Sequence, residues 1–171
     1  SGIVTTLANS TLIKKISATH NILCHETNIG FKYFTPFLTQ ARSQSKLYIG
    51  VESSGGFSVS SHTFDKCGFL PILLILGIMK KKNVPLYELS SDIDREYLTF
   101  HFFEDYIDTF SAVNIKTMVL NTQDKLSELF QLPIESINQS DGLKITFSNQ
   151  DWVLCRASGT EPLIRIYAES T

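Results

Sequence analysis

The segment Cys155–Tyr167, CRASGTEPLIRIY, decides how the C-terminal part of the chain folds. The apolar runs at its two ends predict two strands, and the glycine and hydroxyl residues between them predict a turn. Such a turn directs hydroxyls and successive backbone N–H groups into one concavity, where arginine guanidinium groups can grip phosphate oxygens. The candidate phosphate-binding residues are Arg156, Ser158, Gly159, Thr160 and Arg165. Spacing alone leaves open the alternative of a plain hairpin turn with solvated arginines.

Working outward, the rest of the C-terminal part predicts a small α+β domain with an antiparallel sheet. Its strands are expected at residues 98–108, 142–149, 151–157 and 163–170, with one helix at 121–132. The N-terminal part instead alternates strands with helices, which predicts an α/β layer. Its strands are expected at residues 2–6, 21–27 and 46–52, and its helices at 10–20, 31–44 and 69–79. We expect the last of these to be buried, residues 84–97 to form a polar linker, and the domains to span 1–93 and 94–171.

Size, charge and cysteine content exclude several classes of protein. At 171 residues with a formal net charge of −2, the chain has no global field that would draw it to nucleic acid or to a membrane. Its longest apolar run, residues 69–79, is shorter than the roughly 20 residues that cross a bilayer, and no signal peptide is evident. Three scattered cysteines predict free thiols in the cytoplasm. His20, Cys24 and His25 lack a second ligand pair at zinc spacing, so we expect no metal site.

A second candidate site follows the strand at residues 46–52, in the stretch GVESSGG, Gly50–Gly56. Glu52 and Ser54 would share one face of an extended backbone, where a carboxylate beside a hydroxyl suits the hydroxyl groups of a sugar. The alternative is a glycine-serine loop without a ligand. Lone basic residues near these loops are surface groups by default, but they can also serve phosphate binding or proton transfer. These residues are Lys32, His62 and Lys66.

These stretches, in this order, resemble the C-terminal half of the α-D-phosphohexomutases, the phosphoglucomutase and phosphomannomutase superfamily. RASGTEPLIRIY is similar to the phosphate loop of that family, and GVESSGG to its sugar loop. GFKYF resembles a segment of glucomutase-like members, and SSHTFDKCG resembles the motif that opens a long apolar helix. SDGLKITF followed by DWVLCRASGTEP also keeps the family order.

The resemblance implies most of domain 3, with its N-terminus truncated, and all of domain 4, a small domain of TATA-box-binding-protein-like fold. It implies an isomerase, an intramolecular phosphotransferase that interconverts hexose 1-phosphate and hexose 6-phosphate. The phosphoserine and Mg²⁺ loops of the family belong to its first two domains, so this chain alone should be inactive. A glucose 1,6-bisphosphate-type activator and the N-terminal domains are the implied partners, beside the phosphosugar, with glucose favoured over mannose.

By resemblance, the turn near the C-terminus would hold the phosphate that is not transferred, and Glu52 would hold the sugar hydroxyls together with Ser54, Lys32 and His62. Lys66 would be the catalytic residue of this chain. Three positions depart from the family pattern: Val51, Ser53 and Cys67. They keep open a non-catalytic phosphosugar-binding module, or a decayed mutase paralogue, as the alternative function.

Overall fold

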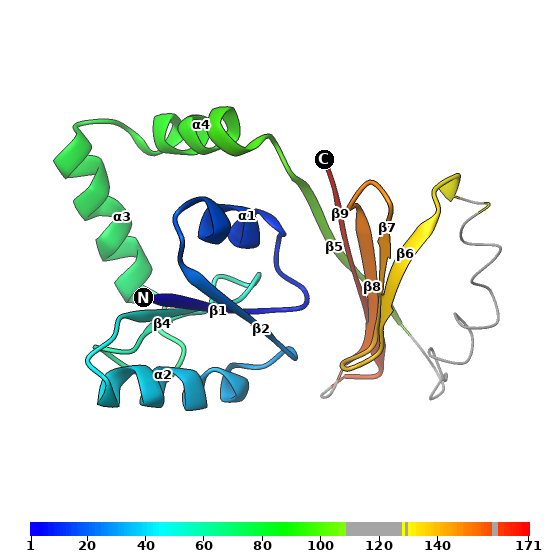
Figure 1. The fold of residues 1–171 in the computed structure, drawn as a ribbon, viewed down its shortest axis with the longest axis horizontal. Coiled ribbons are helices and arrows are strands. Elements are labelled where there is room, and N and C mark those ends of the chain that lie inside the picture. Colours follow the sequence, from blue (N-terminus) through cyan, green and yellow to red (C-terminus); the bar gives the residue numbers. More distant parts are fainter. Residues whose placement is uncertain (109–127, 129, 159–160) are drawn as a thin grey trace. The chain divides into compact units, whose positions relative to one another are not determined.

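The computed structural model describes residues 1–108, 128, 130–158 and 161–171, and it divides the chain into two compact units, Ser1–Thr99 and Phe100–Thr171 (Figure 1). Residue 93, where we placed the end of the first domain, lies within a helix, α4 (Leu86–Tyr97). The expected helix at residues 121–132 falls largely outside the described residues, as do Gly159 and Thr160.

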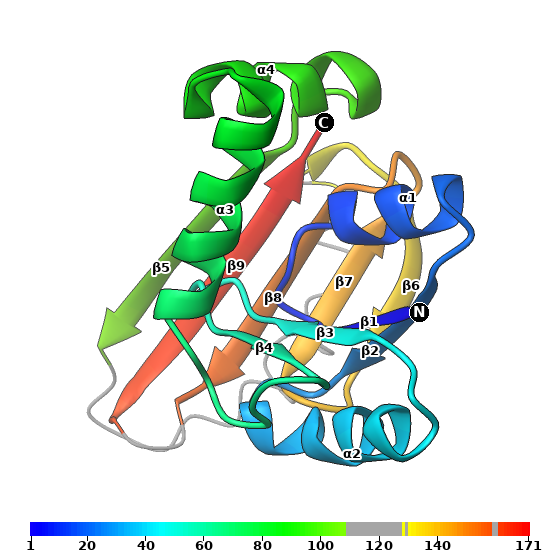
Figure 2. The ribbon, with the colours of Figure 1, turned by 90° about the vertical axis from the view of Figure 1, so that its left-hand side faces the viewer.

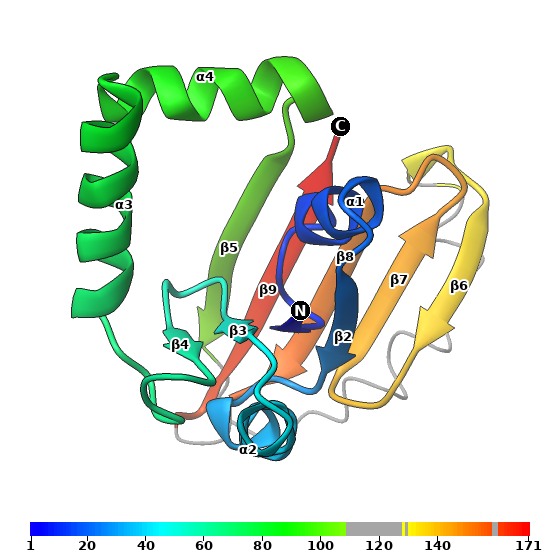
Figure 3. The ribbon, with the colours of Figure 1, turned by 60° about the vertical axis from the view of Figure 1, so that its left-hand side comes forward.

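The first unit is built on a four-stranded sheet in the order β2-β1-β3-β4. Strand β1 (Gly2–Thr6) runs parallel to both β2 (Leu23–Thr27) and β3 (Tyr48–Val51), and β4 (Phe57–Val59) is antiparallel to β3. Helix α1 (Leu12–Thr19) lies on one side of this sheet and α2 (Thr35–Ser43) on the other (Figures 1 and 3). The predicted α/β layer is therefore confirmed.

The core of this unit lies between the sheet and α2. Val4 from β1 packs with Phe34 and Leu38, and all three are fully buried. Each of these side chains contributes about 1.5–3 kcal/mol through its removal from water. Gly50 in β3 lets Phe34 approach the sheet, because a Cβ atom at this position would lie 2.7 Å from the Phe34 ring. Phe31, Phe37, Tyr48 and Phe64 pack around this cluster.

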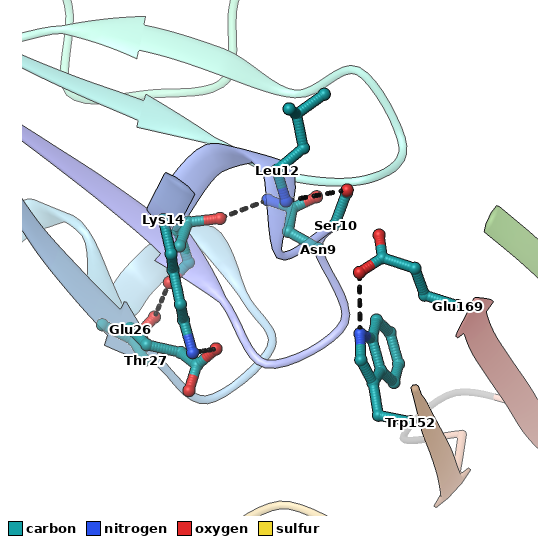
Figure 4. A network of polar contacts seen from close by, with 9 residues as sticks. Asn9, Ser10, Leu12, Lys14, Glu26, Thr27, Trp152 and Glu169 are labelled. Atoms are coloured by element: carbon teal, nitrogen blue, oxygen red, sulfur yellow. Dashed lines mark hydrogen bonds and ion pairs between the residues drawn. The ribbon is translucent and has the colours of Figure 1, made fainter. Parts of the chain in front are cut away.

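Local polar contacts fix the first helix. The Ser10 hydroxyl accepts a hydrogen bond of 3.1 Å from the Leu12 backbone N–H at the start of α1 (Figure 4). On the next turn, Lys14 forms a 2.7 Å ion pair with Glu26 of β2 (Figure 4). Helix α2 accommodates Pro36 because this residue lies in the first turn, where a missing N–H costs nothing.

Two expectations for residues 69–97 are wrong. Helix α3 (Phe69–Lys82) forms as predicted but contains no buried residue, and the Phe69 side chain is 82% exposed. A helix that is apolar all round needs neighbours on several sides, and the main neighbours of α3 among the described elements are β4 and α4. The expected linker is the regular helix α4, which follows α3 (Figure 2).

The spacing of the apolar residues of α4 explains why this segment is helical. Leu86, Leu89, Ile93 and Tyr97 recur at helical spacing, and Pro85 stands just before the first turn. Tyr97 is buried, and its hydroxyl lies 2.9 Å from the His20 Nε2 atom at the end of α1. The tyrosine therefore holds the last turn of α4 against the end of α1 within the first unit.

The second unit is a five-stranded antiparallel sheet in the order β5-β9-β8-β7-β6 (Figure 3). Its strands are β5 (His101–Asp108), β6 (Ile134–Asn138), β7 (Leu143–Phe147), β8 (Trp152–Ala157) and β9 (Leu163–Ser170). One face buries Leu143, Ile145 and Phe147. The predicted antiparallel sheet is confirmed, although β6, like β4 in the first unit, was not predicted.

The opposite face of this sheet carries polar and charged residues among its aromatic ones. The Trp152 indole N–H donates a 3.0 Å hydrogen bond to Glu169 (Figure 4). The Lys144 amine lies 3.9 Å from the centre of the Trp152 ring. All three side chains are buried. These contacts offset part of the cost of removing the two charged groups from water.

Candidate functional site

Glu52 and Lys66, two of the predicted site residues, form an ion pair in the first unit. The Lys66 Nζ atom lies 2.6 Å from Glu52 Oε2. Only 8% of the Glu52 side chain is exposed, whereas 51% of the Lys66 side chain is exposed. The carboxylate is thus held in a sheltered place by a cation that remains open to solvent and to ligands.

A tight loop after β3 sets the position of Glu52. The Glu52 N–H donates a 2.9 Å hydrogen bond to the Gly56 carbonyl, and the Gly55 N–H donates one of 3.0 Å to the Glu52 carbonyl. Gly55 adopts a φ of 79°, which favours glycine. Strand β3 ends at Val51, and Ser54 lies in the turn that follows. The expectation that Glu52 and Ser54 share one face of an extended strand is therefore wrong.

Gly56 makes the contact between the carboxylate and the amine possible. A Cβ atom at Gly56 would lie 2.7 Å from Lys66 Cε and 3.0 Å from Glu52 Oε2. The Lys66 amine also lies 5.9 Å from the centre of the Phe31 ring, in the 3-10 turn η1 (Phe31–Tyr33). The three motifs predicted to contact sugar therefore meet around this lysine.

The other predicted residues of this site lie on the same segments but are exposed. Ser54 belongs to the Glu52 loop, and His62 precedes Lys66 on the segment between β4 and α3. Lys32 is in η1, where its amine lies 5.1 Å from the centre of the Tyr33 ring. Their side chains are open to a ligand, while Glu52 and Lys66 form the fixed part of the site.

Sequence reasoning missed Asn9, which holds the strand that carries Glu52. Asn9 is buried just after β1, and its side-chain amide donates hydrogen bonds to the Thr5 hydroxyl (2.5 Å) and to the Val51 carbonyl (2.8 Å). It thereby fixes the end of β3 directly before the carboxylate. The sequence signal that could have identified Asn9 is a polar residue placed soon after a strand predicted to be buried.

The candidate phosphate site in the second unit is centred on two arginines. Arg156 of β8 and Arg165 of β9 are directly paired across the antiparallel ladder, so their side chains project from the same face. Arg156 Nε lies 2.8 Å from Asp141 Oδ1. Arg165 lies 3.1 Å from the Glu161 carboxylate and 3.7 Å from that of Glu104. The carboxylates hold both guanidinium groups in place.

The turn between β8 and β9 is closed by the backbone of Ser158. Its N–H donates a 2.9 Å hydrogen bond to the Leu163 carbonyl, and its hydroxyl accepts one of 3.3 Å from the Glu161 N–H. Asp141 reaches Arg156 from the neighbouring β6–β7 turn, where Gly142 has a φ of 92°. A Cβ atom on Gly142 would lie 2.5 Å from the Cys155 carbonyl oxygen, so the close approach of this turn requires glycine.

Two further groups in the second unit have pKa values shifted by their surroundings. Burial raises the pKa of the Tyr167 hydroxyl, and the nearby Glu104 carboxylate raises it further, against the opposing effect of Arg165 and Arg156. Tyr167 is two residues from Arg165 and shares its face of the sheet. On the other face, burial raises the pKa of the Cys155 thiol. The predicted free thiols are confirmed, since Cys24, Cys67 and Cys155 are all unpaired and partly buried.

The described residues do not fit a metal site. They contain no group of three or more His, Cys, Asp or Glu side chains that would hold an ion. Of the rejected zinc ligands, His25 contacts the rings of Phe37 and Tyr48, with ring centres 4.7 and 5.8 Å away. None of the described helices is both long and apolar enough to span a membrane.

Comparison with known proteins identifies both units. The family model of the phosphoglucomutase/phosphomannomutase α/β/α domain III matches residues 1–97, and that of the C-terminal domain matches residues 113–171. The phosphoglucosamine/phosphogalactosamine mutase of Sulfurisphaera tokodaii is 28% identical over 98% of this chain and 34% of its own length. The phosphoglucomutase/phosphomannomutase of Thermococcus kodakarensis is 29% identical, again over 98% and 34%.

Solved structures agree on the fold. The phosphoglucomutase parafusin of Paramecium superposes with a TM-score of 0.75 at 20% identity, over 99% of this chain and 33% of its own. The N-acetylphosphoglucosamine mutase of Aspergillus fumigatus, solved with GlcNAc-6P and magnesium, gives a TM-score of 0.59 at 15% identity, over 99% and 38%. The chain thus spans about a third of the length of the relatives it matches. Its two units, each with its own candidate site, are domain III and the C-terminal domain of a member of the phosphoglucomutase/phosphomannomutase family.

Proposed function

We propose that this chain is the sugar- and phosphate-binding C-terminal portion of a phosphohexomutase, with domains at residues 1–93 and 94–171. In the whole enzyme, a phosphoryl group would move between the 1- and 6-positions of a hexose. The family match over both units supports the proposal, because curated relatives named as mutases align along nearly the whole chain. The observation that carries it is the paired chemistry of the units, an anchored carboxylate in one and opposed arginines in the other.

The phosphate that is not transferred would bind at Arg156 and Arg165. Two guanidinium groups side by side present forked donors that match the oxygens of a dianion. Ser158, Gly159 and Thr160 would complete the site with hydroxyl and backbone N–H donors. A loop that holds phosphate without contacting the reacting atoms serves positioning, on which phosphoryl transfer largely depends.

The sugar hydroxyls would bind at the Glu52 carboxylate. Its position is fixed by the loop hydrogen bonds and by Lys66, so the ligand meets an acceptor that is already oriented. Lys66, half exposed, would donate to phosphate or move a proton during transfer, and Ser54, Lys32 and His62 would line the rim. Because a carboxylate accepts from any neighbouring pair of hydroxyls, the same group can serve both orientations of a sugar bisphosphate. We favour glucose over mannose.

Other properties of the whole enzyme follow from the family. We propose that Mg²⁺ and a glucose 1,6-bisphosphate-type activator act with its N-terminal domains, in the cytoplasm, and that this chain alone is inactive. The described residues hold no site that fits Mg²⁺. No membrane or nucleic acid partner is proposed.

One observation bears on the alternative of a binding module without catalysis. At two of the three departures from the family motifs, the backbone makes the local contact. The Val51 carbonyl accepts a hydrogen bond from the Asn9 side chain, and the Cys67 N–H donates one of 2.8 Å to the Phe57 carbonyl. Ser53, the third, is exposed. Binding would therefore survive these substitutions whether or not the whole protein catalyses transfer.

An NMR titration of the chain with glucose 1-phosphate tests the binding proposal. We expect shifts of the backbone amides near Glu52 and Lys66 in one unit and near Arg156 and Arg165 in the other, with weak affinity, on the order of 1 mM. Inorganic phosphate should shift only the second set. Arg165→Met should abolish the second set, whereas Arg95→Met is the matched control. An absence of shifts with both ligands would contradict the proposal.

Catalysis is tested with the product of the whole open reading frame that contains this sequence. If the gene encodes phosphoserine and metal loops upstream of Ser1, the full product should interconvert glucose 1-phosphate and glucose 6-phosphate, and Lys66→Met should slow it. If those loops are not encoded, the mutase proposal fails and the binding module remains.

A further inference from the structure

The segment between β4 and α3, residues 60–68, carries both His62 and Lys66. Several hydrogen bonds fix its two ends. At the start, the buried Ser60 hydroxyl donates to the Lys46 carbonyl (2.9 Å) and accepts from the Tyr48 N–H (3.0 Å). At the end, the Cys67 N–H donates to the Phe57 carbonyl (2.8 Å). The course of the residues between these anchors decides where the Lys66 side chain begins.

Arg42, in the last turn of α2, contacts the first half of this segment. Its Nε atom donates a 2.6 Å hydrogen bond to the Ser60 carbonyl, and its Nη2 atom donates one of 2.8 Å to the His62 carbonyl. Its guanidinium carbon lies 4.4 Å from the centre of the Phe64 ring. One planar group therefore spans two carbonyls and stacks on an aromatic ring, which a lysine ammonium cannot do.

The stacked ring connects Arg42 to the site. Phe64 and Phe31 both pack against the core cluster of the first unit, and the Lys66 amine lies over the Phe31 ring. Lys66 follows Phe64 by two residues and reaches Glu52 at 2.6 Å. A change in the position of the Phe64 backbone would therefore move the origin of the Lys66 side chain relative to a carboxylate that is fixed elsewhere.

We infer that Arg42 is a positioning residue of the sugar site, which acts through His62 and Phe64 to place Lys66 against Glu52. The inference rests on the proposed function for its effect on ligand binding, but the placement of Lys66 is a property of the unliganded chain. Because Ser60 keeps its own two hydrogen bonds, loss of the Arg42 guanidinium leaves the start of the segment anchored, and the fold should survive.

The first test measures the placement of Lys66 without any ligand. The chain is treated with an amine-acylating reagent, and the rate of modification at Lys66 is followed by residue-resolved mass spectrometry. Arg42→Met should raise the rate at Lys66 by up to about fivefold, the change expected when an ion pair is lost. Arg42→Lys should give little rescue. Arg95→Met, which removes an arginine whose described contacts are Ser91 and Asp92, should leave the rate unchanged. Lys82 provides an internal reference in every sample.

The second test separates positioning from general loss of structure. Glucose 1-phosphate binding is measured by NMR in the original chain, in Arg42→Met, in Lys66→Met and in the double variant. If Arg42 acts through Lys66, Arg42→Met weakens binding severalfold in the original chain and has little further effect once Lys66 is replaced. Equal losses in both backgrounds would overturn the inference.

The outcomes of the two proposals are distinguishable. If Lys66→Met leaves glucose 1-phosphate binding unchanged, the proposed sugar site fails, while the acylation rates still decide the role of Arg42. If Lys66→Met weakens binding but Arg42→Met changes neither binding nor acylation at Lys66, the role of Arg42 is refuted and the sugar site stands.

Discussion

Gly56→Ala is the sharpest perturbation of the sugar site, because it adds a single methyl group between the two charged partners. The new Cβ atom would lie 2.7 Å from Lys66 Cε, 3.0 Å from Lys66 Cδ and 3.0 Å from Glu52 Oε2. Gly56 is not among the residues with positive φ, so alanine fits its backbone without strain. The lysine side chain is the flexible partner, and we expect it to swing out into solvent.

The expected cost follows from the burial of the two partners. The exposed Lys66 amine gains water when it leaves, so the direct attraction contributes less than about 1 kcal/mol. Glu52, with 8% of its side chain exposed, loses its counter-charge, and a buried acceptor left without its partner costs about 1–3 kcal/mol. We therefore expect Gly56→Ala to lower the free energy of unfolding by about 1–2 kcal/mol and to weaken glucose 1-phosphate binding about tenfold.

Gly55→Ala is the matched control. Gly55 has a φ of 79° and no atom within 4 Å of an added Cβ, so alanine there should cost a similar stability through backbone strain, about 1–2 kcal/mol, without touching the ion pair. Urea unfolding gives the stability of each variant, and NMR titration gives its affinity. The reasoning is refuted if Gly56→Ala binds the ligand as tightly as Gly55→Ala and leaves the acylation rate of Lys66 unchanged.

Three other predictions concern single features of the two units. Gly142→Ala should cost at least about 2 kcal/mol in urea unfolding, because its Cβ would meet the Cys155 backbone carbonyl at 2.5 Å and its φ is 92°; a loss under half of that would contradict the steric account. The raised pKa of Tyr167 means that its contribution to stability is complete below the unfolded value of 10.0 and is lost as the pH rises through the higher folded value. At alkaline pH, the free energy of unfolding should thus fall more steeply with pH in the original chain than in Tyr167→Phe. Parallel curves of this free energy against pH would refute the prediction. The exposed apolar surface of α3 should drive self-association of the isolated chain, which light scattering should find reduced in the double variant Leu73→Lys, Leu76→Lys; unchanged scattering would count against that surface.

The sequence predicts elements well where pattern and chemistry coincide. The β-branched run at Gly2–Thr6 and the apolar spacing after Ser10 define β1 and α1 because a single periodicity is sufficient there. In α4, charged residues and Pro85 concealed an equally regular spacing. The short strands β4 and β6 have no pattern of their own, since each is defined by the ladder of its neighbour, β3 or β7.

The candidate sites show a similar division. The motifs identify Glu52 and Lys66 separately, but their contact depends on backbone hydrogen bonds within the Glu52 loop and between Cys67 and Phe57. Asn9 and Arg42 act on carbonyl oxygens, which every residue has, so no side-chain pattern marks their targets. The exposure of α3 was equally hidden, because an apolar run predicts a need for burial and not the neighbours that provide it.

The placement of Arg156 and Arg165 directly opposite each other on neighbouring strands sets the stability of the sheet against anion binding. Two cations opposite each other on antiparallel strands repel, and nearby carboxylates only partly relieve that repulsion. This repulsion destabilises the hairpin at the place where we propose that an anion binds. An oxyanion bound between the two guanidinium groups would neutralise their repulsion and raise the melting temperature of the second unit. Replacing one arginine by a neutral residue would stabilise the sheet and weaken anion binding.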